Sequence, residues 1–234
     1  MNKNLIIIIA VLFIMQLSQN VLANVHGSMG LGLNYNFKYD LDNLNSNFES
    51  NHIGTISDKT SLINICVHIF NDKNKFIWGI DANSATQLIQ RTSKGDSLTS
   101  SLYKISSTFD FGYHLISEKK FSIFPLLGVG YSKNEISIYQ NVLEEDWNNF
   151  SNSKIENYII TRNDLIMKLS LRAELLLIDF NKGKSFIPIG IETGYILPFY
   201  NFNNVFSTGQ TVKNFPDYQL GGLFLNFTLG YSDY

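Results

Sequence analysis

Hydrophobic and polar residues alternate along much of the chain with the period of a β-strand. In the segment GLGLNYNFKY, residues 30–39, the alternate positions Leu31, Leu33, Tyr35 and Phe37 are apolar, and the positions between them are glycine, asparagine or lysine. Successive side chains of a strand point to opposite faces of a sheet. We therefore expect a strand here with one apolar face and one small, polar face.

The same alternation predicts eight strands. The connections between them alternate between short polar turns, such as NDKNK and SEKK, and long polar loops. An up-and-down transmembrane barrel has this arrangement, with short turns on the periplasmic side and long loops outside the cell. A sandwich or Greek key has no reason to place every long connection at one end. The expected strands lie at about residues 25–39, 63–69, 76–83, 103–115, 121–131, 165–177, 187–197 and 222–231.

Charge decides which face of these strands meets lipid. The mid-strand charges Asp81, Asp110, Arg172, Glu174 and Glu192 all lie on the glycine-rich face and not among the leucines. A basic group placed against hydrocarbon at the membrane midplane would cost roughly 2–4 kcal/mol. A soluble, lipocalin-like barrel is the alternative, but it would enclose the apolar set and expose the charges. We therefore predict an apolar outer surface and a polar lumen.

Aromatic residues gather near the expected strand ends on the apolar face. In membrane proteins such residues form girdles at the two lipid–water interfaces. We expect the following residues to mark the interface near the loops or the turns: Tyr35, Tyr131 and Tyr195 near the loops, and Trp78, Tyr113 and Tyr231 near the turns.

The N-terminus has the composition of a secretory signal peptide. Lys3 provides a positive charge, residues 5–17 are almost entirely apolar, and Val21-Leu22-Ala23 fits the small-residue rule for cleavage. A membrane-spanning helix is the alternative, although the apolar run is short for one. We expect residues 1–23 to be a signal peptide and residues 24–234 to form the barrel domain.

Two segments share a further pattern. FSIFPLLGVGY (121–131) and KSFIPIGIETGY (184–195) each follow a short basic turn and run through proline to glycine and tyrosine. With the alternating strands, they make the chain resemble the small eight-stranded outer-membrane barrels of Gram-negative bacteria, the OmpA-domain and OmpX-like group and the related outer membrane beta-barrel family.

The resemblance implies an all-β fold, an eight-stranded antiparallel up-and-down transmembrane barrel preceded by a signal peptide. It implies a place in the bacterial outer membrane, with outer-membrane lipids and the barrel-insertion machinery as partners. Such barrels usually end in an aromatic residue of the last strand. Here the alternation ends at Tyr231 and three further residues follow, so the match is offset.

Pro125 and Pro188 conflict with regular strands. Proline removes a hydrogen-bond donor from the ladder, and a closed barrel has no free edge. Both residues lie within a few positions of a short turn, so we expect them at rim or bulge positions.

Composition excludes some functions. The net charge of −2 and the lack of a basic run indicate no nucleic-acid partner. Cys66 is the single cysteine, so it cannot form an internal disulfide, and we expect a sheltered thiol. No metal-ligand cluster or phosphate-binding loop stands out in the sequence. We therefore expect no cofactor, no metal and a monomeric chain.

The inward charges predict a filled lumen. Isolated buried charges are expensive, so we predict an interior salt-bridge network around Arg172 that plugs the barrel. A conductance pathway is the alternative interpretation of the same residues. His26 and Ser28 share a face, and His68 and His114 also point inward, but none has a spacing that indicates a catalytic triad. We therefore expect no catalytic residue.

These observations predict a non-enzymatic integral outer-membrane barrel of the cell envelope with a structural or surface-interaction role, in adhesion or envelope integrity. The long loops, including the acidic LEEDWNNF (143–150), are where an extracellular ligand would bind. The alternatives are a narrow, porin-like channel and a lipid-modifying barrel enzyme.

Overall fold

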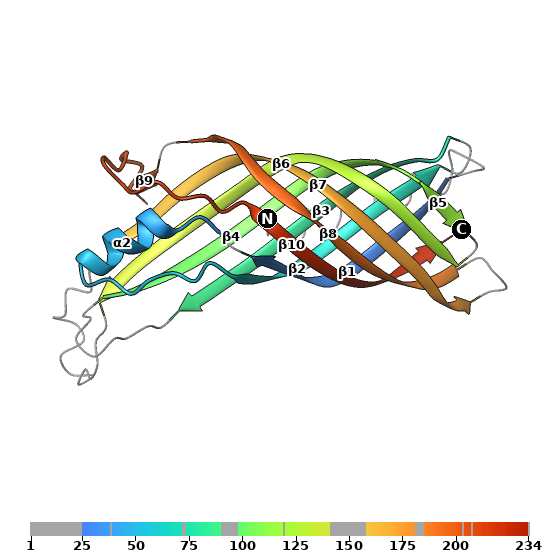
Figure 1. Ribbon diagram of the computed structural model, residues 1–234, viewed down its shortest axis with the longest axis horizontal. Coiled ribbons are helices and arrows are strands. Elements are labelled where there is room, and N and C mark those ends of the chain that lie inside the picture. The colour runs from blue at the N-terminus through green and yellow to red at the C-terminus, as the bar shows by residue number, and fades with distance from the viewer. Residues whose placement is uncertain are drawn as a thin grey trace.

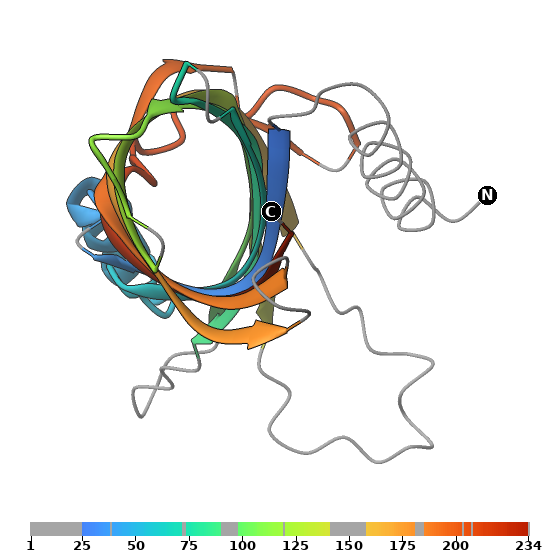
Figure 2. The same ribbon diagram turned by 90° about the vertical axis from the view of Figure 1, so that its right-hand side faces the viewer.

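The computed structural model of the chain is a closed antiparallel β-barrel, and Figure 2 shows the ring of strands almost end-on. The structure describes residues 25–37, 39–71, 74–89, 98–118, 120–140, 158–180, 185–202, 204–206 and 208–233. The predicted signal peptide and the acidic loop at 143–150 lie outside the described residues. The eight long strands are β1 (Val25–Phe37), β2 (Thr60–Asn71), β3 (Phe76–Ile89), β4 (Leu98–Tyr113), β6 (Phe121–Gln140), β7 (Tyr158–Phe180), β8 (Ser185–Asn201) and β10 (Gly222–Asp233).

Each long strand pairs with the long strands next to it along the chain, and β1 pairs with β10 to close the ring. The closing register runs from Gly27 opposite Asp233 to Phe37 opposite Leu223. Two short strands, β5 (Ile116–Glu118) and β9 (Val205–Phe206), pair with β6 and β7, respectively, at opposite ends of the barrel (Figure 1). The predicted up-and-down topology of eight strands is confirmed.

The two faces of the strands differ as the alternation predicts. On the outer surface Leu31, Leu169 and Leu229 are about 60% exposed, with individual values of 61%, 64% and 58%. Inward residues such as Asn64 and Asp110 have no exposed surface. The apolar set therefore lies outside the barrel and the polar set fills its lumen.

β6 and β7 continue well past their predicted ends towards the long loops. In this extension the pattern reverses: the inward residues Ile136, Ile138 and Ile160 are apolar and buried, while Lys133 and Glu135 point outward and form an ion pair at 2.6 Å. The reversal shows that the extension stands outside the hydrocarbon, because water there replaces lipid around the barrel. The expected boundaries at 131 and 165 follow the apolar outer face and end where it ends.

A cap at the loop end of the barrel packs against this extension. It consists of residues 39–59 with helix α2 (Asp42–Ser50), and of the described part of residues 204–221. Figure 1 shows α2 at the same end of the barrel as β9. The helix was not predicted. Its residues Leu44 and Phe48 are fully buried in an apolar core formed by the cap and the strand extensions, whose other members are Tyr39, Leu41, Ile56, Leu102, Ile136, Ile138, Ile160, Tyr218 and Leu220.

Side chain–backbone hydrogen bonds fix the shape of the cap. The Asn45 side chain donates to the carbonyl of Ile56 and accepts from its backbone N–H, both at 2.9 Å. This pair ties α2 to the segment that returns to β2. Within the described residues no helix is long and apolar enough to cross a membrane.

The strand prolines lie at irregularities of the ladder. Pro188 and Pro198 lie at the two register shifts between β7 and β8. Pro125 lies where β6 changes partner from β4 to β5, and there residues 113–115 stand opposite residues 124–125. The expected bulge positions of Pro125 and Pro188 are confirmed.

The orientation of the outer face can be tested with a charge at its centre. Leu171 is 48% exposed and lies in the middle of the outward apolar series of β7. We expect Leu171→Arg to lower the free energy of unfolding in phospholipid vesicles by roughly 2–4 kcal/mol, because the guanidinium would face hydrocarbon. Ser137→Arg, on the outer face of the β6 extension, is the matched control and should have little effect. Equal losses for the two variants would contradict the orientation.

Candidate functional site in the barrel lumen

A row of residues on five neighbouring strands builds the centre of the lumen. His68 on β2 pairs with Gly79 on β3, Gly79 with Asp110 on β4, Asp110 with Gly128 on β6, and Gly128 with Lys168 on β7. Large polar side chains thus alternate with glycine around the ring. A Cβ at Gly79 would overlap the His68 ring, and a Cβ at Gly128 would overlap the Asp110 carboxylate. These two positions require glycine because their neighbours occupy the space of a side chain.

Lys168 is the centre of the charges. Its ammonium forms ion pairs with Oδ2 of Asp81, with Oδ2 of Asp110 at 2.6 Å and with Oε1 of Glu192 at 3.0 Å. The four side chains are at most 4% exposed. One cation therefore pairs with carboxylates from three different strands.

Arg172 forms the second half of the network. Its Nε donates to Oε1 of Glu174 at 2.7 Å, and its Nη2 donates to the hydroxyl of Thr228 at 2.8 Å. Its Nη1 lies 3.4 Å from Oε2 of Glu192. Since Glu192 also contacts Lys168, it bridges the two cations.

We call Asp81, Asp110, Lys168, Arg172, Glu174 and Glu192 the lumen charge cluster. The structure brings together all five residues that the sequence analysis assigned to a lumen network. It places Lys168 at the centre, whereas the sequence analysis placed Arg172 there and did not include Lys168 in the network. Two cations and four carboxylates give the ionised cluster a net charge of −2.

An aromatic layer lies between the cluster and the short turns. The centre of the Phe70 ring lies 5.2 Å from the ring centres of His26 and His114. The centre of the Phe124 ring lies 5.8 Å from that of Phe70 and 5.2 Å from that of His114. His68 touches the same layer, with its ring 6.2 Å from Phe124. The inward histidines therefore pack against phenylalanine in the lumen.

Asparagines fill the lumen on the loop side of the cluster. Asn226 donates to Asn64, and Asn64 donates to Asn83, both at 3.0 Å. All three side chains are buried, so these amide hydrogen bonds link β10, β2 and β3 inside the lumen.

Arg162 on β7 holds the cap to the barrel wall through its contacts with Tyr218. Arg162 lies 3.0 Å from Asp164, donates to the Tyr218 carbonyl at 2.6 Å and stacks 3.7 Å from the Tyr218 ring centre. Burial raises the pKa of the Tyr218 hydroxyl to about 12, and burial also raises the pKa of Tyr39. Lys104 donates to the Leu220 carbonyl at 2.5 Å. Sequence reasoning missed Arg162 and Asp164 because it placed them in a loop.

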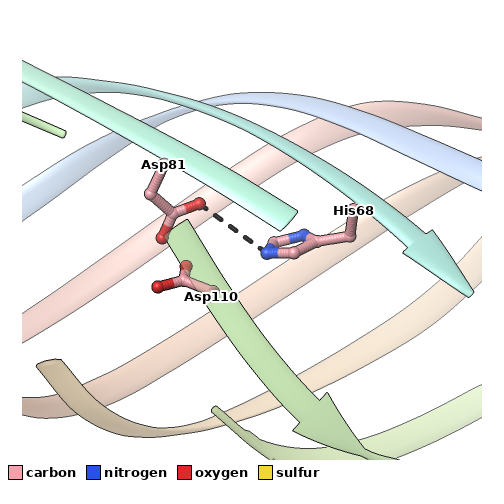
Figure 3. Close-up of side chains that lie close together, drawn as sticks. All are labelled: His68, Asp81 and Asp110. Carbon is pink, nitrogen blue, oxygen red and sulfur yellow. Dashed lines mark ion pairs between the residues drawn. The ribbon is translucent and has the colours of Figure 1, made fainter. Parts of the chain in front are cut away.

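His68, Asp81 and Asp110 come close to one another, as Figure 3 shows. His68 Nε2 lies 3.7 Å from Oδ1 of Asp81. A histidine beside an aspartate is a familiar acid–base pair in enzymes. Here, however, both side chains are almost completely buried between the aromatic and asparagine residues. A substrate in water or in the membrane does not reach them in this structure.

The predicted interface aromatics all lie on the outer surface. Tyr35, Tyr131 and Tyr195 are 39%, 42% and 48% exposed on β1, β6 and β8. Trp78 and Tyr113 lie nearer the turns on β3 and β4, and Tyr231 lies near the end of β10. Two groups of outward aromatics are therefore separated along the barrel, as the expected girdles require.

A groove of about 950 Å³ lies where the cap meets the outer surface. Its apolar part includes Phe37, Leu223 and Tyr195, which are consecutive cross-strand neighbours on β1, β10 and β8. We call it the mouth groove. Its other part is lined by four carboxylic acids and, among the residues that the structure describes, by no lysine or arginine: Asp40, Asp42, Glu49 and Asp58.

No protein-family model matches the chain, and no curated protein matches its sequence. Among solved structures it is similar to Ail, the attachment invasion locus protein of Yersinia pestis, at 11% identity over 89% of this chain and 97% of that one, with a TM-score of 0.40. A major outer membrane protein from Thermus thermophilus aligns at 13% identity over 88% and 98% of the two chains, with a TM-score of 0.45. The outer membrane protease OmpT from Escherichia coli aligns at 11% identity over 92% and 99%, with a TM-score of 0.32.

The chain's own strand pairing and surface show what kind of protein it is. Closed barrels with an apolar outer band and a polar lumen are the β-structures that span membranes, because closure satisfies all strand hydrogen bonds. The chain is therefore a closed barrel with the surface of a membrane-spanning protein. Its predicted resemblance to the small eight-stranded outer-membrane barrels is confirmed for the fold.

The central role of Lys168 can be tested by removing its charge. We expect Lys168→Met to lower the free energy of unfolding by roughly 3–5 kcal/mol, because it leaves buried carboxylates without a counter-charge. Adding Asp110→Asn should restore part of the loss. The ion pair between Lys133 and Glu135 on the outer surface provides the control: Lys133→Met should lower the free energy of unfolding by at most about 1 kcal/mol. Equal losses for Lys168→Met and Lys133→Met, measured by denaturant unfolding in vesicles, would contradict this role.

Proposed function

We propose that this protein is a non-enzymatic outer-membrane barrel with a closed lumen, and that it acts through its extracellular surface. The observation that carries the proposal is the filling of the lumen. Buried charges pair with one another at its centre, the aromatic layer lies below them, and the apolar core of the cap lies above them. Such a barrel supports the envelope and presents a folded surface to the outside.

The filling argues against a channel. An ion passing along the lumen would have to separate Lys168 from its carboxylates, and separating a buried pair is strongly unfavourable. It would also have to pass the rings of Phe70 and Phe124, which contact each other across the lumen. The narrow channel is therefore the weaker of the two interpretations.

Planar-bilayer recording tests the closed lumen. We expect the full chain to give no steady conductance, because the charge cluster and the aromatic layer are part of the barrel itself. A variant with residues 41–56 replaced by a short glycine–serine linker should also stay silent, because the cap is not the only barrier. Steady, voltage-independent conductance of the unaltered chain would refute the proposal.

The mouth groove is where we propose that the surface role operates. Its apolar floor continues the lipid-facing surface, and its acidic wall belongs to the cap. Carboxylates beside an apolar surface at the membrane boundary suit an amphiphile with a cationic head. The lipid-modifying enzyme has less support, since the buried His68 and Asp81 face the lumen and not the lipid.

Binding of an acylated oligolysine peptide to the full chain in lipid nanodiscs tests the groove. We expect Asp40→Asn/Asp42→Asn/Glu49→Gln to weaken binding about ten-fold, since three exposed charge contacts together contribute roughly 1–2 kcal/mol. The matched control is Asp217→Asn/Glu135→Gln, which removes acidic residues outside the groove. If both variants bind the peptide as the unaltered chain does, the groove is not the site.

A further inference from the structure

We propose that His68, Asp81 and Asp110 bind one divalent transition-metal ion inside the lumen, with zinc as its representative. The three residues come from the adjacent strands β2, β3 and β4, and each can offer one ligand atom such that the three atoms lie within 4.8 Å of one another. Figure 3 shows the imidazole and the two carboxylates turned towards a common space. This inference does not depend on the proposed surface role.

The first observation is a set of buried polar atoms without hydrogen-bond partners. In both carboxylates, Oδ2 accepts a hydrogen bond from the ammonium of Lys168. Their Oδ1 atoms and both ring nitrogens of His68 have no hydrogen-bond partner among the described residues. His68 and Asp110 have no exposed surface and Asp81 is 2% exposed. A buried polar atom without a partner costs about 1–3 kcal/mol, so several of them in one place indicate a position for a bound ion.

The second observation is charge. The lumen charge cluster carries a net charge of −2 when its members are ionised, and Lys168 and Arg172 are already paired. One divalent cation would make the cluster neutral. Buried charge without compensation is unfavourable, so the cluster favours an occupant with two positive charges.

The third observation is space. Gly79 stands opposite both His68 and Asp110, and Gly128 stands opposite Asp110. A methyl group at Gly128 would overlap Oδ1 of Asp110, one of the two carboxylate oxygens of this site without a hydrogen-bond partner among the described residues. The glycines therefore leave the ligand atoms free to close around an ion. Ligand atoms of zinc lie roughly 3–4 Å apart at bond lengths of about 2.0–2.2 Å. Side-chain rotations that move the ligand atoms by about an ångström therefore complete the site.

The ligand types select the class of ion. An imidazole with two carboxylate oxygens suits zinc and its transition-metal neighbours, whereas magnesium and calcium prefer oxygen ligands alone. The aromatic layer and the asparagines separate the site from both ends of the barrel. We therefore expect the ion to enter while the barrel closes and to act as a structural ion that stabilises the fold.

Metal content after refolding tests the site. The full chain is refolded from denaturant into detergent micelles with zinc and excess magnesium, passed over a desalting column and measured by mass spectrometry of the elements. We expect about one zinc per chain, and a higher unfolding midpoint than after refolding with a chelator. Folding is checked independently by circular dichroism and by the gel shift of the unheated barrel.

Two variants and one control make the test specific. His68→Gln removes a ligand, and Gly128→Ala keeps all three ligands but fills the space beside Asp110. Each should fold and retain less than about a tenth of the zinc. His26→Gln changes another inward histidine, in the aromatic layer, and should keep the full zinc content.

X-ray absorption at the zinc edge identifies the ligands. We expect one imidazole and oxygen neighbours at about 2.0–2.2 Å in the refolded, unaltered chain. A sulfur neighbour would overturn the assignment, because it would show that the ion binds Cys66, the chain's single cysteine, which stands opposite Asp81. The proposal also fails if the folded chain holds no more zinc than folded His68→Gln. In that case a water molecule or a charged His68 satisfies the buried carboxylates.

Discussion

The structure depends on the burial of charge in a narrow space that is surrounded first by protein and then by hydrocarbon. Lipid outside forces the polar side chains of every strand into the lumen, and barrel closure leaves them little water there. Lys168 meets this constraint by pairing with carboxylates from β3, β4 and β8, and Glu192 extends the pairing to Arg172. The closed lumen and the glycines that make room for its side chains both follow from that arrangement.

Much of the fold could be predicted from the sequence because lipid acts on each strand separately. The alternation in residues 30–39 identifies the outer face of β1 without reference to any other strand, and the same holds for Leu169 and Leu171 on β7. The alternation of turns and loops then determines the topology. The surroundings of the prolines could also be predicted, because proline is compatible with a closed barrel only at an irregularity of the strand ladder. Pro125 and Pro188 lie at such positions.

The rest could not be predicted because it depends on register and on the local solvent. Alternation identifies the face of a residue but not its height, so the row from His68 through Asp110 to Lys168 is visible only when the strands are paired. For this reason the sequence pattern favours Arg172 as the centre of the network. In the extension of β6 and β7 the apolar residues face inward and the polar residues face outward, which is the reverse of the strands at lipid depth. The sequence analysis therefore ends the strands before this extension and leaves Ile136 and Ile160 in a loop. The helix α2 has only Leu44 and Phe48 to indicate its buried face.

Closure at both ends of the lumen separates two kinds of role. Residues between the aromatic layer and the cap take their final places when the last strands pair, since no described opening reaches them afterwards. Whatever satisfies the unpartnered atoms of His68, Asp81 and Asp110 must therefore enter with folding and stay, in the manner of a structural ion or an ordered water molecule. Exchange with the surroundings is left to the cap and the mouth groove, where the carboxylates are exposed and meet the outer lipid surface. The lumen thus contributes stability, and under the proposed function recognition belongs to the surface that the lumen supports.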